Sequence, residues 1–515
     1  MTSPNSQTKT YAKTGIAGLD EVLCGGFSPG HVFLLEGEPG AGKTTVALQF
    51  VLEGASLGEK TLYITLAESA AELRQSAASH GWSLDDLTLF EVVTPESLLD
   101  REHQQSLLYS SDLELGETTK QIFDAVDRVK PARVVIDSLS EIRLLAQSSL
   151  RYRRQILAIK HYFAKHNATV LMLDDLTAEE GDKTVHSVVH GVVRLEELVP
   201  NYGAERRRLR VLKYRGQRYR GGHHDFTIAT GGVQIFPRLV ASEHRKGFER
   251  HKLPTGNAAF DALLGGGADG GSSTLILGPA GTGKSLIAIV FAMAAIARGE
   301  KAALFIFDEE IGLLASRMKQ LGIDLDGAAD AGHLMIQQID AAEMSPGEFA
   351  HQVRATVDSQ NIKTVIIDSL NGYQAAMPEE NELVLHVHEL LQYLNRQGAT
   401  TFMTVAQHGL VGNMDAPLDI TYLADTVILL RYFEAFGEVR RAVSVIKKRT
   451  GEHELTIREF SIGANGLALG EPLVKFHGVL NGVPSYTGAA SPLLEPQQTN
   501  DDKLTSLSAK SGSVL

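Results

Sequence analysis

The sequence has very little cysteine and no long apolar run. Its 515 residues include one cysteine, Cys24, which excludes an intramolecular disulfide and fits a reducing compartment. No apolar stretch approaches the roughly 20 residues that a bilayer-spanning helix needs. The N-terminal residues MTSPNSQTKTYAK lack the apolar segment of a secretory signal. We therefore expect a cytoplasmic protein without a membrane segment.

An excess of basic residues is also missing, because the net charge is −13. Proteins that grip nucleic acid continuously usually carry a basic excess, since neutralising phosphates supplies most of that affinity. Residues 205–222, ERRRLRVLKYRGQRYRGG, form the most basic stretch, but their aromatics do not make a stacking series. Nucleic acid is therefore not an expected partner.

What the sequence does have is an internal repeat. The segment TGIAGLDEVLCGGFSPGHVFLLEGEPGAGKTT, starting at Thr14, returns as TGNAAFDALLGGGADGGSSTLILGPAGTGKS from Thr255. Later, RVVIDSLSEI pairs with TVIIDSLNGY, and VLKYRG (211–216) pairs with VIKKRTG (445–451). The landmarks keep the same order in both halves, which indicates the duplication of one domain.

Each copy alternates apolar strands with helical connections, a pattern typical of an α/β fold with a mostly parallel sheet flanked by helices. The polar stretch near 240–250 lacks apolar periodicity and is the expected join. We predict domains at 14–245 and 246–486, with disordered tails at 1–13 and 487–515.

Two phosphate-binding loops carry the clearest chemistry. GEPGAGKT and GPAGTGKS fit the pattern G-x-x-x-x-G-K-[ST], each after an apolar strand and before a helical pattern. The glycines let backbone N–H groups wrap phosphates, and the lysine reaches the terminal phosphates. The predicted ATP-binding residues are Gly37, Glu38, Pro39, Gly40, Ala41, Gly42, Lys43, Thr44 and Thr45 in the first copy, and Gly278, Pro279, Ala280, Gly281, Thr282, Gly283, Lys284 and Ser285 in the second.

An acidic residue closes a later apolar strand in each copy. Asp137 and Asp368 are predicted to bind Mg²⁺ together with the loop hydroxyls of Thr44 and Ser285. The alternative for each aspartate is that it caps the following helix.

Together, the TG…LD lead-in, the P-loops, the IDSL strands and the K-x-R strands resemble the RecA-type ATPase superfamily. The duplicated form resembles the KaiC family of circadian-clock ATPases and autokinases, over roughly residues 12–470. The resemblance implies two tandem RecA-like P-loop NTPase domains that bind ATP and Mg²⁺. It also implies a hexamer of double-decker subunits, with ATP at the subunit interfaces of both rings.

KaiC-like sequences carry two adjacent glutamates at the end of the strand after the P-loop helix, one of which activates the attacking group. By this resemblance the first copy has Ala67 and Glu68 there, and the second has Asp308 and Glu309. The catalytic candidates are therefore Glu68, Asp308 and Glu309. We expect slow hydrolysis or structural ATP in the first copy; a helix N-terminal carboxylate is the alternative role for Glu68.

The K-x-R strands supply the next candidates. Positions two apart on a strand face the same side, so Lys213 and Arg215, or Lys447 and Arg449, can reach one target. The resemblance implies that they reach the ATP of the neighbouring subunit. A charged pair on a solvated strand is the alternative.

Two further roles come from the resemblance. Matching on ADTVILL puts Thr421 and Tyr422 where KaiC carries its adjacent phosphoacceptors, so Thr421 is the candidate acceptor. Gln407 lies where RecA-type proteins place a polar γ-phosphate sensor, and we align Asp174-Asp175 with it in the first copy. An unphosphorylated Thr-Tyr pair that leads a strand remains the alternative for Thr421.

The sequence thus predicts an ATP-hydrolysing, KaiC-like signalling hexamer with Ser/Thr autokinase capacity in domain 2 and unidentified protein partners. The alternatives are a RecA- or RadA-like ATPase acting on DNA and an ATP-dependent assembly scaffold with little turnover.

Overall fold

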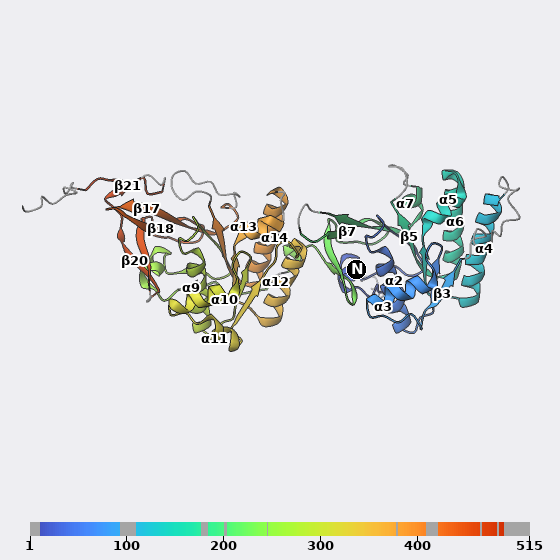
Figure 1. The fold of residues 1–515 in the computed structure, drawn as a ribbon, viewed down its shortest axis with the longest axis horizontal. Helices are drawn as coiled ribbons and strands as arrows, with labels where there is room; N and C mark the ends of the chain where they lie inside the picture. Colours follow the sequence, from blue (N-terminus) through green and yellow to red (C-terminus); the bar gives the residue numbers. More distant parts are fainter. Residues whose placement is uncertain are drawn as a thin grey trace, which may run out of the picture.

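The computed structural model describes residues 11–92, 110–176, 184–199, 203–244, 246–376, 380–407, 421–463, 466–480 and 484–488. They form two domains that lie end to end (Figure 1). Each domain is built on a nine-stranded sheet. The predicted tails fall mostly outside the described residues, although Ala12 already pairs with Phe27, before the predicted domain start.

The domain 1 sheet is mixed: six neighbouring strands are parallel, and three antiparallel strands follow at one edge. Its order is β3 (Thr88–Glu91), β2 (Thr61–Thr65), β4 (Arg133–Asp137), β5 (Thr169–Asp175), β1 (Val32–Gly37), β6 (Gly191–Leu198), β7 (Arg206–Tyr214), β8 (His224–Ala229) and β9 (Gly232–Phe236). The central strands are buried on both faces, as continuous Val, Ile and Leu runs predict.

Helices cover both faces of this sheet. One face carries α1 (Ala17–Val22), α2 (Lys43–Ser56) and α3 (Ala70–Ser79). The other carries α4 (Ser110–Val129), α5 (Leu139–Ala146) and α6 (Ser149–His166), with α7 (Thr184–Val188) before β6.

Domain 2 repeats this plan strand for strand. Its sheet order is β14 (Leu334–Gln338), β13 (Ala302–Ile306), β15 (Thr364–Asp368), β16 (Thr400–Ala406), β12 (Ser273–Gly278), β17 (Thr426–Ala435), β18 (Glu438–Lys448), β19 (Arg458–Gly463) and β20 (Gly466–Pro472). Helices α8 (Ala258–Leu263), α9 (Lys284–Ala297), α10 (Ile311–Gln320) and α11 (Leu325–Asp330) cover one face, and α12 (Pro346–Gln360), α13 (Leu370–Ala376) and α14 (Glu380–Gln397) cover the other. The short pairs β10 (Lys252–Leu253) with β11 (Ala268–Asp269), and β21 (Phe476–His477) with β22 (Ser485–Tyr486), lie outside the sheet. The predicted tandem α/β fold is confirmed.

The antiparallel edge of domain 1 packs on α12 of domain 2. The carboxylate of Asp225 on β8 accepts a hydrogen bond from the N–H of Gly347 in the first turn of α12, at 2.7 Å. The rings of Phe236 and His351 lie 5.4 Å apart across the same contact. A carboxylate beside helix N–H groups is stabilising, so Asp225 joins the domains through the dipole of α12.

Replacing Asp225 with alanine should weaken this junction, because the N–H of Gly347 loses its acceptor. We expect a loss of about 1 kcal/mol in the unfolding free energy of domain 2, by analogy with a lost helix cap. Differential scanning calorimetry would detect it as a lower melting temperature. Asp225→Asn, which keeps an oxygen acceptor, should lose less; an Asp225→Ala chain that melts like wild type would contradict the contact.

Candidate functional site

Each P-loop connects the central strand of a sheet to a long helix. In domain 1 the loop runs from Gly37 at the end of β1 to Lys43, the first residue of α2. In domain 2 it runs from Gly278, at the end of β12, to Lys284, the first residue of α9. The first-turn N–H groups of these 14-residue helices therefore face the loop, where an anion is stabilised.

The glycine before each lysine is required by its conformation and its surroundings. Gly42 and Gly283 have φ values of 95° and 106°, in a region that favours glycine. A Cβ atom at Gly42 would lie 2.5 Å from Cδ1 of Ile228, and one at Gly283 would lie 2.5 Å from Cδ1 of Ile462. A side chain there would therefore be strained by its backbone conformation and would have to push the end of that isoleucine aside.

The two P-loop lysines are buried but differ in their partners. The amino group of Lys43 donates to the carbonyl oxygens of Gly37 and Glu38 at 2.9 and 2.8 Å, and pairs with Asp175 Oδ1 at 2.7 Å. The amino group of Lys284 donates to the carbonyl oxygen of Pro279 at 2.8 Å. Burial lowers the pKa of Lys284, and the nearby charge of Asp368 opposes that shift.

The predicted Mg²⁺ residues of domain 1 lie together. The hydroxyl of Thr44 is 3.3 Å from Asp137 Oδ2, and the hydroxyl of Tyr63 donates to the same oxygen at 2.6 Å. Burial raises the pKa of Asp137, while these hydrogen bonds oppose the rise. A hydroxyl and a carboxylate beside phosphate-binding N–H groups suit Mg²⁺ held by a nucleotide. No sequence pattern pointed to Tyr63, whose counterpart in domain 2 is Leu304.

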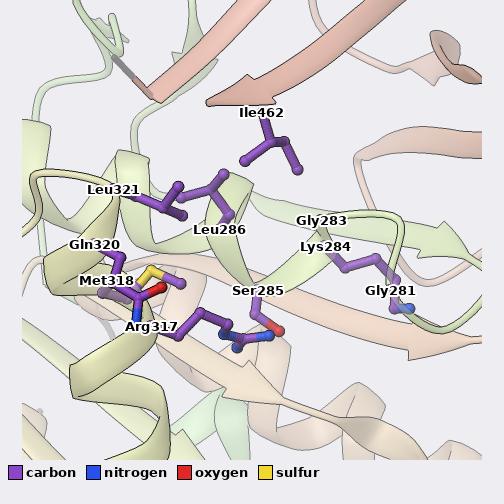
Figure 2. A pocket seen from close by; sticks show the side chains of 10 residues that line it. All are labelled: Gly281, Gly283, Lys284, Ser285, Leu286, Arg317, Met318, Gln320, Leu321 and Ile462. Carbon is purple, nitrogen blue, oxygen red and sulfur yellow. The ribbon is translucent and has the colours of Figure 1, made fainter. Parts of the chain in front are cut away.

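In domain 2, Asp368 accepts a hydrogen bond from Thr404, and Ser285 lines a hollow beside the P-loop. The hollow measures about 280 Å³, and Figure 2 shows Lys284 and Ser285 at one side of it and Ile462 at another. Leu286 and Leu321 extend its apolar wall. A cationic end beside an apolar wall suits the phosphates and the base of a nucleotide.

Helix caps confirm the alignment of the carboxylates after the second strand. The hydroxyl of Ser69 caps α3, and the carboxylate of Glu310 caps α10 through the N–H groups of Gly312 and Leu313 at 2.9 and 2.8 Å. Counting back from the caps matches Ala67 with Asp308. It also matches Glu68 with Glu309, as the resemblance implied.

These carboxylates have different surroundings. Asp308 accepts a hydrogen bond from the hydroxyl of Ser369, the residue after Asp368. Glu309 pairs with Arg317 at 2.7 Å. In domain 1, partial burial raises the pKa of Glu68, and the charges of Asp137, Glu72 and Asp175 add to the rise. Domain 2 thus directs a carboxylate at Ser369, the residue after Asp368, where domain 1 has a methyl group.

The structure corrects our alignment of the sensor position. The N–H of Gln407 donates to Gly278 at 3.1 Å, and the N–H of Leu176 donates to Gly37 at 3.2 Å. Leu176 is therefore the counterpart of Gln407, and the alignment with Asp174-Asp175 was wrong. Strand register explains the error: Asp175 lies opposite Gly37, as Ala406 lies opposite Gly278.

The sensor role of Gln407 stays a prediction. Its side-chain oxygen is buried and has no hydrogen-bond partner among the described residues. A buried acceptor without a donor is costly, so a donor such as a bound water would satisfy it.

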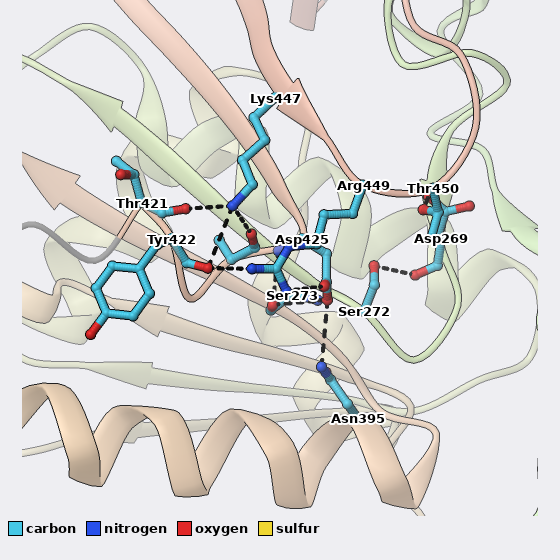
Figure 3. Close-up of polar contacts among 11 residues, drawn as sticks. Asp269, Ser272, Ser273, Asn395, Thr421, Tyr422, Asp425, Lys447, Arg449 and Thr450 are labelled. Carbon is cyan, nitrogen blue, oxygen red and sulfur yellow. Dashed lines mark hydrogen bonds and ion pairs between the residues drawn. The ribbon is translucent and has the colours of Figure 1, made fainter.

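The K-x-R side chains hold backbone within their own domains. Lys447 donates to the carbonyl oxygens of Thr421 and Ala424 at 2.9 and 2.8 Å, and Arg449 contacts Tyr422 and Asp425 (Figure 3). The K-x-R residues of domain 1 behave alike: Lys213 donates to the carbonyl oxygens of His186 and Val189, and Arg215 donates to that of Ser187. Each pair fixes the segment that leads into β6 or β17, the strand beside the P-loop strand of its domain.

These residues lie at the edge of the sheet where β12 and β17 begin, opposite the edge that carries the P-loop. Lys447 pairs with Val427, and the neighbouring Thr426 lies beside Thr274 at the start of β12. The P-loop begins at Gly278, four residues further along, or about 13 Å at 3.3 Å per strand residue. The K-x-R residues therefore lie away from the P-loop of their own domain.

The model of the KaiC ATPase family matches residues 12–240 and again residues 253–473. The chain belongs to the KaiC ATPase family. The circadian clock protein KaiC3 of Synechocystis sp. is 28% identical over 483 residues, which cover 92% of this chain and 94% of that protein. The circadian clock oscillator protein KaiC of Synechococcus elongatus is 28% identical over 94% of this chain and 94% of that protein. The circadian clock oscillator protein KaiC of Acaryochloris marina is also 28% identical, over 93% of this chain and 92% of that protein.

Membership of the KaiC family supports ATP binding by this chain. It confirms the predicted family and the duplication. Within the described ranges, no helix is both long and apolar enough to cross a membrane.

Substituting Gly283 with alanine should impair the second ATP site, because its φ of 106° is strained for alanine and the new methyl group must displace the end of the Ile462 side chain. We expect a loss of about 1–2 kcal/mol of stability from the backbone alone, and a large loss of ATP affinity, measured by calorimetric titration. Gly299→Ala is the matched control: its φ is 84°, but a Cβ atom there meets nothing within 4 Å. That control should lose stability and keep ATP affinity; equal ATP affinity in both variants would contradict the role of Gly283.

Proposed function

We propose that this KaiC-family protein is a Mg²⁺-dependent ATPase whose domain 2 carries most of the turnover, while domain 1 holds ATP or hydrolyses it slowly. The supporting observation is Asp308, whose carboxylate is hydrogen bonded to Ser369 beside Asp368. Domain 1 has Ala67 at that position and keeps its loop, lysine and metal-site residues.

The chemistry follows from these residues. Lys284 and the loop N–H groups neutralise the phosphates, and Mg²⁺ held through Ser285 and Asp368 would offset charge on the transferring phosphoryl group. Asp308, assisted by Glu309, accepts the proton of the attacking water. General-base catalysis contributes on the order of 10²–10⁴-fold, so its reduction in domain 1 predicts slow turnover there.

The position of the K-x-R residues favours assembly, with the family's hexamer as the proposed form. Because Lys447 and Arg449 lie at the edge opposite their own P-loop, they can reach ATP only in a neighbouring subunit. The Arg449 side chain is 50% exposed, so its guanidinium group lies at the surface while it contacts Tyr422 and Asp425. The same reasoning applies to Lys213 and Arg215 in domain 1.

The same geometry directs the proposed autokinase. Thr421 precedes β17 at that edge, so the phosphoryl group would come from ATP of a neighbouring subunit. The Thr421 hydroxyl attacks the γ-phosphorus, its proton passes to a carboxylate such as Asp308 or Glu309, and ADP leaves. Beside it, Tyr422 is 53% exposed. The proposed output is a conformational change that signals to protein partners in the cytoplasm.

The ion pairs of the basic stretch argue against the DNA-acting alternative. Arg207 pairs with Glu197 at 3.1 Å, and Arg208 and Arg210 pair with Glu196 at 2.8 and 3.2 Å. These cross-strand pairs between β6 and β7 neutralise charges that a phosphate backbone would need. DNA that stimulates ATP turnover in a salt-dependent way would instead favour the alternative.

Substituting the two P-loop lysines separately tests which domain carries most of the ATP turnover. Lys284→Ala should remove most of the steady-state ATP turnover, because it disables the site with the carboxylate pair. Lys43→Ala should retain most of it. Phosphate release at saturating Mg·ATP is the measurement, with wild type as reference. A Lys43→Ala chain that loses most of the activity would show that the assignment is reversed, and no turnover in wild type would favour the scaffold alternative.

Phosphopeptide mapping after incubation with Mg·ATP tests the autokinase. Phosphate should appear on Thr421 and be absent from Thr421→Ala. Mixing Lys284→Ala chains with Thr421→Ala chains should restore phosphate on the former, because transfer passes between subunits. Persistent absence of phosphate from Thr421 in wild type would end this part of the proposal.

A further inference from the structure

We propose that Asp175 sets the nucleotide preference of domain 1, by competing with the terminal phosphate of ATP for the ammonium group of Lys43. This inference rests on the proposed binding of Mg·ATP at the domain 1 P-loop. Asp175 is then a specificity residue that weakens the binding of ATP more than the binding of ADP.

The contact lies where a phosphate would bind. Lys43 is 7% exposed, and its three N–H bonds have three acceptors: the carbonyl oxygens of Gly37 and Glu38, and Asp175 Oδ1 at 2.7 Å. P-loop lysines use this ammonium group to contact the β- and γ-phosphates. A terminal phosphate must therefore displace the Asp175 carboxylate or bind beside it.

The carboxylate is also held from its other side. The hydroxyls of Ser140 and Ser138 lie 3.2 and 3.5 Å from Asp175 Oδ2. These contacts keep Oδ2 on the α5 side while Oδ1 faces Lys43. Moving Asp175 away from an incoming phosphate would break this arrangement.

Domain 2 provides a natural comparison within the same chain. Ala406 takes the position of Asp175, because each residue lies opposite the last residue of its P-loop strand. Asn371 takes the position of Ser140, and its side-chain amide donates to the carbonyl oxygen of Ala406 at 3.1 Å. In the described part of the chain, no carboxylate forms an ion pair with Lys284. The ammonium group of domain 2 thus lacks the competitor.

The surroundings of the domain 1 P-loop are also more acidic than those of the domain 2 P-loop. Around its loop, domain 1 carries carboxylates where domain 2 has uncharged residues. The pairs are Glu36 and Leu277, Glu38 and Pro279, Asp174 and Val405, and Glu197 and Tyr432.

Some of these carboxylates have cations of their own. Arg194 pairs with Glu36 at 2.6 Å, and Arg143 pairs with Asp174. Asp175 differs from them because its ion pair is with the P-loop lysine itself. Of the five carboxylates, it is therefore the one placed to act on the nucleotide.

The consequence depends on the charge of the nucleotide. ATP brings a γ-phosphate to the lysine and ADP does not, so the repulsion by Asp175 acts more strongly on ATP. Domain 1 is then expected to bind ATP weakly relative to ADP when compared with domain 2. After slow hydrolysis it would retain ADP.

Calorimetric titration of full-length chains with Mg·ATP and with Mg·ADP tests the proposal. Domain 1 is isolated with Lys284→Ala, and Asp175→Asn is then added, because asparagine keeps the shape and removes the charge. We expect Mg·ATP to bind about tenfold more tightly, as for removal of one partly buried charge contact, and Mg·ADP to gain less. The reciprocal change, Ala406→Asp in a Lys43→Ala chain, should weaken Mg·ATP at domain 2.

Several outcomes would overturn the assignment. Weaker Mg·ATP binding in Asp175→Asn would mean that the carboxylate helps to hold Mg²⁺ or the phosphates. Unchanged affinity for both nucleotides, in a variant that melts like its parent, would mean that Lys43 is released from Asp175 at no cost. If neither parent bound Mg·ATP, the proposed function itself would fail, and this assignment with it.

Discussion

Both halves of this molecule are organised around a lysine ammonium group that is buried at the start of a helix. A charge removed from water needs oxygen partners, and the P-loop supplies them from its own carbonyl groups. Lys43 and Lys284 are 7% and 9% exposed, so neither is satisfied by solvent. The central parallel strand, the glycines with positive φ and the helix dipole all bring anionic phosphate to this group. We propose that the acidic strand ends around it decide whether ATP is held or hydrolysed.

The duplication preserved this scaffold and changed the acidic strand ends. Domain 2 has Asp308 beside Ser369 and Ala406 opposite Gly278, whereas domain 1 has Ala67 and Asp175 at those positions. One carboxylate that would assist hydrolysis is missing from domain 1, and another that opposes the terminal phosphate is present. Both differences favour holding nucleotide over turning it over. In the proposed assembly, the K-x-R pairs at the opposite edge of each sheet would complete the site of a neighbouring subunit.

Much of this could be predicted from the sequence, because it depends on local patterns. The P-loops are contiguous motifs, and the Ala67 and Asp308 match depends on short spacings that the helix caps confirm. The Gln407 alignment failed, because the end of a strand is set by its register with the neighbouring strand and not by flanking residues. The ion pair of Asp175 with Lys43 depends on β5 lying beside β1, although the two strands are more than a hundred residues apart. Strand order is a property of the whole sheet, so no local pattern could have shown that contact.

We propose that the missing carboxylate at Ala67 limits hydrolysis in domain 1 even when ATP is bound. The most direct measurement is ATP turnover at saturating Mg·ATP by Ala67→Asp in a Lys284→Ala chain, compared with Lys284→Ala alone. Ala67 is exposed, so the aspartate can be accommodated. We expect a rise of about a hundredfold, the low end of general-base effects, and no rise for Ala67→Asn. Unchanged turnover in the Ala67→Asp chain, with ATP shown to be bound, would contradict it.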